Sequence, residues 1–226
     1  MIVAIDGPAG AGKSTVARLL ARELGFGYLD TGAMYRAMLF AALAAGTDLE
    51  DSEALYRSCQ NAELEFSLEG IRFKGNLLAE EIRTPEISRG VKTIADHLGI
   101  RQLLVEKQRE LAQCSNVVCE GRDQGTVAFP KADCKIFLTA SSGERAKRRQ
   151  QELSDKGRQI TLEAIQQDQD ERDHQDCQRT VGALQKAEDA IEFNTDGLSI
   201  QQVVEQLTAM VKTKIGAREN SPCKES

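Results

Sequence analysis

IVAIDGPAGAGKST, residues 2–15, is the stretch of sequence that decides the fold. Residues 2–5 are apolar and lead into a glycine-rich loop, which indicates a short buried strand. From Ser14 to Leu24, apolar side chains recur with helical spacing until Gly25. Residues 7–14 match the pattern G-x-x-x-x-G-K-[ST] between that strand and that helix, which is the context that the pattern requires.

This stretch predicts a loop that binds the phosphates of a nucleoside triphosphate. Glycines let successive backbone N–H groups point inward, and the N-terminus of the helix adds partial positive charge. Lys13 would reach the β- and γ-phosphate oxygens, and the Ser14 hydroxyl would bind Mg²⁺. The predicted triphosphate-binding residues are Gly7, Pro8, Ala9, Gly10, Ala11, Gly12, Lys13, Ser14 and Thr15.

Outward from this loop, strand patterns alternate with helix patterns. Short apolar runs at 116–121, 134–140 and 190–194 indicate further inner strands, and helical patterns cover 33–45, 48–60, 88–114, 142–156, 161–180 and 199–214. Alternation of apolar and polar residues at Leu64, Phe66, Leu68, Ile71 and Phe73 instead indicates two antiparallel strands. We therefore predict an α/β fold: a doubly wound parallel sheet of the P-loop NTPase type, with a small antiparallel insertion.

The whole pattern fits one domain over residues 1–215, in which the strand insertion covers about 62–83. Residues 216–226 are expected to be a flexible tail.

Composition limits the classes of function. The chain has 226 residues, a net charge of −6, 41% hydrophobic and 28% charged residues, and no apolar run long enough to span a membrane. The acidic balance argues against DNA, RNA or an anionic membrane as a partner. The six cysteines form no C-x-x-C pair, so we interpret them as free thiols of a cytoplasmic protein, which we expect to be a monomer.

Arginine is the second informative signal. Transfer between two phosphates brings two anions together, and planar guanidinium groups neutralise that repulsion well. The candidates for such an anion pocket are Arg36, Arg101, Arg122, Arg145, Arg148, Arg149, Arg172 and Arg179. The only two histidines, His97 and His174, lie in no evident acid–base setting. A phosphate acceptor, which is already largely ionised at pH 7, therefore fits better than an alcohol that needs a general base.

Five motifs in order, IDGPAGAGKST, LDTGAMYR, EGRDQGTVAFP, KIFLTASSGERAKRR and ERDHQDCQR, resemble those of the bacterial cytidylate kinases. The resemblance runs over about residues 2–213 and includes the strand insertion. It implies a single kinase domain with an acceptor-binding segment at about 31–110 and a lid at about 143–170. It implies transfer of the γ-phosphoryl group of ATP to CMP, and to dCMP, with Mg²⁺ as cofactor. Glu120 stands where some members have Asp, and Lys92 or Thr93 stands where many members carry a Ser that contacts the base.

The resemblance also implies roles for single residues. Thr31 and Arg36 would lie at the acceptor phosphate, Arg122 would contact that phosphate, and Asp123 and Arg101 would lie at cytosine. The lid arginines Arg145, Arg148 and Arg149 would close over the transferring group. Lys13, Arg122, Arg145, Arg148, Arg149 and Arg179 form the expected catalytic set. The CMP-binding set is Thr31, Arg36, Arg101, Arg122, Asp123, Arg172, Asp176 and Arg179.

Physical chemistry supports some of these roles and leaves alternatives. A carboxylate at Asp123 can accept from the exocyclic amine of cytosine, where uracil has a carbonyl, but Asp123 could instead pair with Arg122 or Arg101. In ERDHQDCQR, the spacing of Arg172, Asp176 and Arg179 predicts one helical stripe, which could be a nucleotide clamp or a solvated face. His174 and Cys177 point away from that stripe, and we do not interpret them as a metal site.

Other uses of a triphosphate remain. A kinase for UMP or AMP, a regulatory P-loop ATPase with a protein partner, and an RNA-binding NTPase would all contain the same loop. Rates with different monophosphates, turnover without a monophosphate, and salt-dependent RNA binding would distinguish them.

Overall fold

The computed structural model describes residues 1–155 and 157–219, and it divides into two compact units. Unit 1 comprises Met1–Gly27 and the chain from Asn116 onward, and unit 2 comprises Tyr28–Ser115. Within the described residues, no helix combines the length and the apolar content that a membrane span requires.

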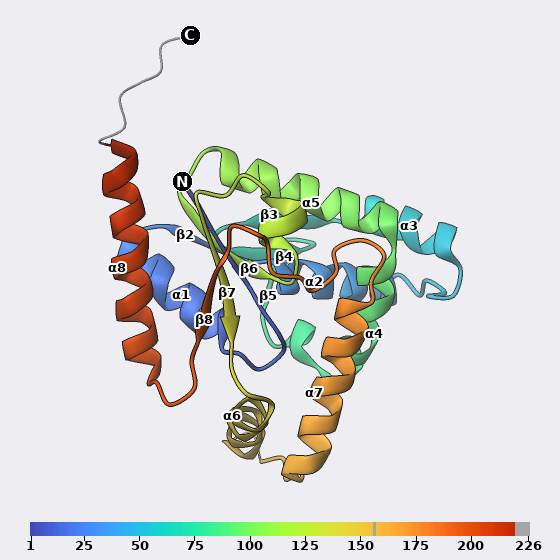
Figure 1. Cartoon of the computed structure of the whole chain (residues 1–226). Coiled ribbons are helices and arrows are strands. Elements are labelled where there is room, and N and C mark those ends of the chain that lie inside the picture. The colour runs from blue at the N-terminus through green and yellow to red at the C-terminus, as the bar shows by residue number, and fades with distance from the viewer. Residues whose placement is uncertain (156, 220–226) are drawn as a thin grey trace. The chain divides into compact units, whose positions relative to one another are not determined.

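A parallel sheet forms the centre of unit 1 (Figure 1). Its strands are β1 (Ile2–Asp6), β6 (Val117–Gly121), β7 (Cys134–Thr139) and β8 (Ile191–Asn194), and they lie in the order β6-β1-β7-β8. At the β6 edge, Gly27 begins β2 (Gly27–Asp30) and donates its N–H to the Asn116 carbonyl. Parallel strands joined by helices confirm the predicted fold class.

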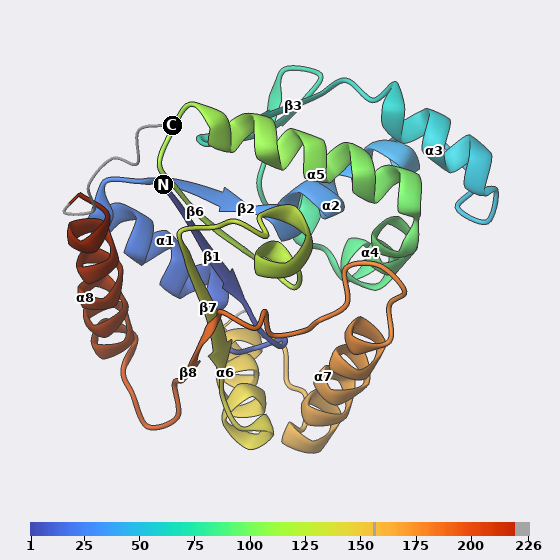
Figure 2. The same ribbon diagram turned by 45° about the horizontal axis from the view of Figure 1, so that its top comes forward.

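A helix with one apolar face packs on this sheet. In α1 (Lys13–Leu24), Val16, Ala17, Leu20 and Ala21 are buried, and the helix ends at Gly25. The helix packs on β6 and against α8 (Ile200–Glu219), as Figures 1 and 2 both show. Two further helices, α6 (Ser142–Asp155) and α7 (Leu162–Cys177), lie side by side and share a small core of Ala146, Leu153 and Ile165.

Unit 2 is mainly helical. It contains α2 (Thr31–Ala44), α3 (Ser52–Gln60), the short 3₁₀ helix η1 (Glu81–Arg83), α4 (Pro85–Asp96) and α5 (Leu98–Gln113). The Asp30 carboxylate accepts the Ala33 N–H at 2.7 Å and so caps the start of α2. In Figure 2, α5 runs near α3, and these two helices are in contact.

The strand insertion is confirmed and is larger than the alternation indicated. Three antiparallel strands, β3 (Leu64–Ser67), β4 (Gly70–Phe73) and β5 (Asn76–Leu78), form a separate sheet. A two-residue turn at Lys74 and Gly75, both with positive φ, leads into β5. The sheet packs on α2, where Phe40 and Phe73 meet edge to face at 5.6 Å between ring centroids.

Three boundaries differ from the prediction. The pattern at 88–114 is two helices, because the chain turns at His97, whose side chain caps α5 by accepting the Ile100 N–H. The predicted helix at 161–180 ends at Cys177. The last helix, predicted over 199–214, is α8 (Ile200–Glu219) and includes residues 216–219 of the predicted flexible tail, whose flexibility stays a prediction. The rest of that tail, 220–226, lies outside the described residues.

Candidate active site

The phosphate loop of unit 1 connects the end of β1 to the start of α1. Gly7 passes so close to β7 that a Cβ on it would lie 2.1 Å from the Leu138 carbonyl oxygen, and its φ of 149° also favours glycine. Gly12, with φ 90°, takes the N-cap position of α1, so the backbone N–H groups at the start of the helix are directed toward the loop. The predicted strand–loop–helix arrangement is confirmed.

Lys13 is buried beside this loop. Its Nζ donates to the Pro8 carbonyl at 2.7 Å, and the residue is 5% exposed. Burial, followed by the nearby charge of Arg122, lowers the pKa of Lys13 to about 7, while Glu120 acts in the opposite direction. In the protein without nucleotide, this ammonium group is therefore poorly stabilised, and an incoming phosphate would stabilise it.

Ser14 is held by a carboxylate at the end of β6. Its hydroxyl donates to Glu120 Oε1 at 2.7 Å, and Glu120 is 5% exposed. A hydroxyl and a carboxylate are both oxygen donors, which Mg²⁺ prefers. The residues present therefore fit the predicted magnesium position at Ser14, and Glu120 adds a second oxygen donor to it.

Asp6, the last residue of β1, supports the neighbouring turn. Its carboxylate accepts the N–H of Gln124 at 2.8 Å and that of Gly125 at 2.7 Å. Burial raises its pKa to about 6, partly opposed by these two hydrogen bonds. The turn that follows Arg122 and Asp123 is thereby fixed to the strand that carries the phosphate loop.

A cluster of two arginines and one aspartate lies in the same unit. Arg122 Nε donates to Asp176 Oδ2 at 2.7 Å, and Arg179 Nη2 lies 2.7 Å from Asp176 Oδ1. The Asp176 side chain is only 5% exposed. Asp176 thus lies between the guanidinium groups of Arg122 and Arg179.

The predicted helical stripe therefore needs a correction. Arg179 lies beyond the last residue of α7 and reaches Asp176 from the following turn. Arg172 is exposed on α7, close enough to Lys13 to contribute to the lowering of its pKa. Asp123 is 5% exposed, and its neighbour Arg122 pairs with Asp176.

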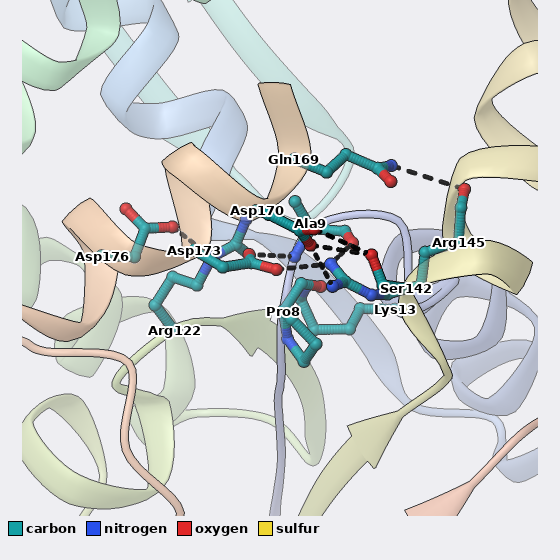
Figure 3. A network of polar contacts seen from close by, with 10 residues as sticks. All are labelled: Pro8, Ala9, Lys13, Arg122, Ser142, Arg145, Gln169, Asp170, Asp173 and Asp176. Atoms are coloured by element: carbon teal, nitrogen blue, oxygen red, sulfur yellow. Dashed lines mark hydrogen bonds and ion pairs between the residues drawn. The ribbon is translucent and has the colours of Figure 1, made fainter. Parts of the chain in front are cut away.

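The three arginines of the predicted lid have different surroundings. Arg145 is 6% exposed and donates to the Ala9 carbonyl at 2.7 Å, with Asp170 and Asp173 as ionic partners (Figure 3). Arg148 donates to the Thr195 hydroxyl and carbonyl at 2.9 and 3.0 Å, and its Nη1 would lie 3.9 Å from a Cβ on Gly12.

Arg149 lies apart from these two. It pairs with Glu152 at 2.7 Å on an exposed face of α6. The structure therefore brings Arg145 and Arg148 to the phosphate loop and does not bring Arg149 there.

Unit 2 holds the other three predicted residues. Thr31, 2% exposed, begins α2, and Arg36 lies 3.4 Å from the capping carboxylate Asp30. Arg101 is 4% exposed, donates to the Ala95 carbonyl at 3.1 Å and lies over the Tyr35 ring at 5.6 Å. Lys92 and Thr93, which precede Arg101, are exposed residues of α4.

His174 and Cys177 have ordinary partners. His174 Nε2 lies 2.9 Å from Gln178 Nε2, and the Cys177 thiol donates to the Leu184 carbonyl at 3.5 Å. Across residues 1–155 and 157–219, no group of three or more His, Cys, Asp or Glu side chains is arranged to hold a metal ion.

Sequence reasoning missed several residues of this site. Asp6 accepts backbone N–H groups of the turn after Asp123, and Asp173 accepts one from the phosphate loop. In unit 2, Arg83 pairs with Asp30 at 3.5 Å. One signal was available for α7: Ile165, Gln169 and Asp176, at i, i+4 and i+11, lie on one helical face, and all three are buried. Asp173 continues that face.

The comparisons with known proteins agree with the motifs. A family model described as cytidylate kinase matches residues 3–213. The cytidylate kinase of Rhodopirellula baltica is 45% identical over 217 residues, which cover 96% of this chain and 95% of that protein. The cytidylate kinase of Desulfitobacterium hafniense is 46% identical over 216 residues, with 94% and 93% covered.

A solved structure supports the fold alone. An uncharacterized protein from Eubacterium ventriosum matches with a TM-score of 0.51 and 11% identity, over 94% of this chain and 99% of that one. Fold, motifs and relatives at this level of identity lead to one assignment. This chain belongs to the cytidylate kinase family.

Proposed function

We propose that this protein transfers the γ-phosphoryl group of ATP to CMP, giving ADP and CDP, and that dCMP is a second acceptor. The observation that carries the proposal is the cluster of Arg122, Asp176 and Arg179 in the unit that also contains the phosphate loop. A triphosphate hydrolase needs a single anion site, whereas phosphate-to-phosphate transfer needs a second one. The family assignment supports the choice of CMP.

On the donor side, residues 7–15 would bind the ATP phosphates through their backbone N–H groups. Lys13 would exchange the Pro8 carbonyl for phosphate oxygens. Mg²⁺ would be held by the Ser14 hydroxyl, by the Glu120 carboxylate and by the phosphates, and when bound it neutralises phosphate charge.

On the acceptor side of unit 1, Arg122 and Arg179 would bind the CMP phosphate, and Arg172 and Asp176 would hold the ribose. Asp123 would accept from the cytosine amine, and uracil would place a carbonyl against that carboxylate. For unit 2, the family resemblance implies a phosphate contact for Thr31 and Arg36 and a base contact for Arg101.

The chemistry requires positioning and charge neutralisation more than a general base. The acceptor phosphate is largely ionised at pH 7, and the arginines reduce its repulsion of the donor phosphates. Arg145, Arg148 and Arg149 belong to the proposed lid at about 143–170, whose closure would exclude water and limit hydrolysis of ATP. We further propose that the protein is a cytoplasmic monomer that binds neither nucleic acid nor membranes.

A panel of monophosphates tests this function. Purified protein is assayed with ATP and Mg²⁺ against CMP, dCMP, UMP, AMP and GMP, by coupling ADP formation to NADH oxidation. We expect the highest kcat/KM with CMP and the next highest with dCMP. A preference for UMP or AMP would contradict the acceptor, and an equal rate without any monophosphate would identify an ATPase.

A further inference from the structure

The phosphate loop is held at one residue by an ion pair from α6 and α7. The Ala9 N–H donates to Asp173 Oδ1 at 2.8 Å, and the Ala9 carbonyl accepts from Arg145 Nη1 at 2.7 Å. The same Arg145 Nη1 also donates to Asp173 Oδ2. Figure 3 shows the three residues in contact. Both polar backbone groups of Ala9 are thus bonded to two side chains that are bonded to each other.

This contact is largely shielded from water. Ala9 is 8% exposed, and the side chains of Arg145 and Asp173 are 8% and 14% exposed. Charge-assisted hydrogen bonds are stronger than neutral ones, and water screens buried charges less than exposed charges. The ion pair therefore constrains the backbone of Ala9 far more than a surface salt bridge would.

The next residue of the loop packs on the same two helices. Gly10 has a φ of 77°, and a Cβ on it would lie 2.5 Å from Gln169 Nε2 and 3.1 Å from Arg145 Cβ. Gln169 Nε2 in turn donates to the Arg145 carbonyl at 3.4 Å. The first half of the phosphate loop thus takes its shape from α6 and α7 as well as from its own glycines.

We propose that Asp173 is a positioning residue that, together with Arg145, holds Ala9 so that the phosphate loop keeps the shape that binds ATP. Asp173 lies between Arg172 and Asp176 on α7, so the same helix turn contacts the donor loop and carries acceptor residues. This inference rests on the proposed use of the loop for ATP. It assigns Asp173 no contact with either nucleotide.

Asp173→Asn tests the proposal, and Asp170→Asn is its matched control. In Asp173→Asn the amide oxygen of the new side chain can still accept the Ala9 N–H, but its NH₂ group would face the Arg145 donor, so the ionic half of the contact is lost. Asp170 also pairs with Arg145, at 3.2 Å, and bonds Ser142 without touching the phosphate loop. ATP is titrated into each protein by calorimetry without CMP, and KM is then measured for both substrates.

For Asp173→Asn we expect the Kd and the KM for ATP to rise on the order of tenfold, as for the loss of one charge-assisted hydrogen bond. The KM for CMP at saturating ATP should change less than the KM for ATP, and Asp170→Asn should leave ATP binding within about twofold of wild type. Arg145→Lys keeps the charge but loses the planar fork, so a smaller loss of ATP affinity is expected and provides a second test if Asp173→Asn does not fold.

Three results would overturn the proposal. Unchanged ATP affinity in Asp173→Asn would leave Asp173 without this role, and tighter binding would mean that its carboxylate competes with phosphate for the Ala9 N–H. An equal loss of ATP affinity in Asp170→Asn would mean that the effect comes from removing any ionic partner of Arg145, and not from the contact between Asp173 and Ala9. The ATP titration needs no acceptor, so failure to phosphorylate CMP would contradict the proposed function and leave this measurement intact.

Discussion

The two proposed anion-binding regions of unit 1 hold their cations in opposite ways. Lys13 donates to a neutral carbonyl, and burial lowers its pKa to about 7. Arg122 and Arg179 share the carboxylate of Asp176, so their charge is already partly compensated. A phosphate that reaches Lys13 therefore stabilises an ammonium group that is poorly stabilised in the free protein. A phosphate at the arginine cluster must instead share the two guanidinium groups with the Asp176 carboxylate. We expect the donor region to depend more on Lys13 than the acceptor region depends on either of its two arginines.

Lys13→Ala should have the largest effect. It removes a buried cation beside the phosphate loop, and loss of one such preorganised charge costs about 10²–10³-fold in kcat. Steady-state rates with ATP varied at saturating CMP check this. Lys186→Ala, which removes an exposed partner of Glu192, is the control and should stay within about twofold. A loss of less than tenfold in kcat for Lys13→Ala would contradict the expected difference between the donor and acceptor regions.

Arg179→Ala should come next. It removes one of two guanidinium groups beside Asp176, so kcat/KM for CMP should fall on the order of 10²-fold, and ATP binding should change little. Calorimetry with ATP and kinetics with CMP separate the two effects. Arg57→Ala, at an exposed pair with Glu53, controls for the loss of an arginine. Equal effects on both substrates would remove Arg179 from the acceptor site.

Much of this comparison was predictable from the sequence, and part of it was not. The phosphate loop is a local pattern, because strand, glycines and helix follow one another without interruption, so its residues and its fold were readable. The partners of the other charged residues of the site could not be predicted, because they lie far away in the sequence. Arg122 and Asp176 are 54 positions apart, and Asp6 and Gly125 are 119 apart. Only the packing of the sheet and of α7 brings such pairs together.

The ends of helices were hard to predict for another reason. Neither the break at His97 nor the end of α7 at Cys177 has a glycine or proline at the boundary. His97 caps α5 with its ring, and α7 ends where the Leu184 N–H bonds the Asp176 carbonyl. Helical periodicity alone therefore extended the predicted helix to residue 180.

Asp123→Ala should have a smaller effect, on base choice. Its carboxylate is proposed to accept from the cytosine amine, so the ratio of kcat/KM for CMP to that for UMP should narrow by about tenfold to 10²-fold. Parallel assays with both monophosphates measure this ratio. An unchanged ratio together with a raised KM for both acceptors would assign Asp123 to support of the turn.

The smallest expected effect is the uptake of a proton by Lys13 when ATP binds. Because its pKa is lowered to about 7 in the free protein, most of Lys13 is neutral at pH 8, and bound phosphate would raise that pKa again. ATP binding at pH 8 should therefore take up as much as one proton, and affinity should weaken as pH rises above 7. Calorimetry in two buffers of different ionisation enthalpy measures the uptake.

Lys13→Arg is the control for this proton, because a guanidinium group stays protonated and should show no uptake. Uptake that persists in Lys13→Arg would come from another group. Absence of uptake in the wild type would mean that Lys13 is fully charged before ATP binds, and the contrast with the arginine cluster would then disappear.

Transfer of label from [γ-³²P]ATP tests the central claim most directly, namely that a second anion is seated beside the phosphate loop to receive the phosphoryl group. Wild-type protein with Mg²⁺ and CMP should place the label in CDP, and little labelled inorganic phosphate should appear when CMP is left out. Label that appears as inorganic phosphate at the same rate with and without CMP would contradict the account.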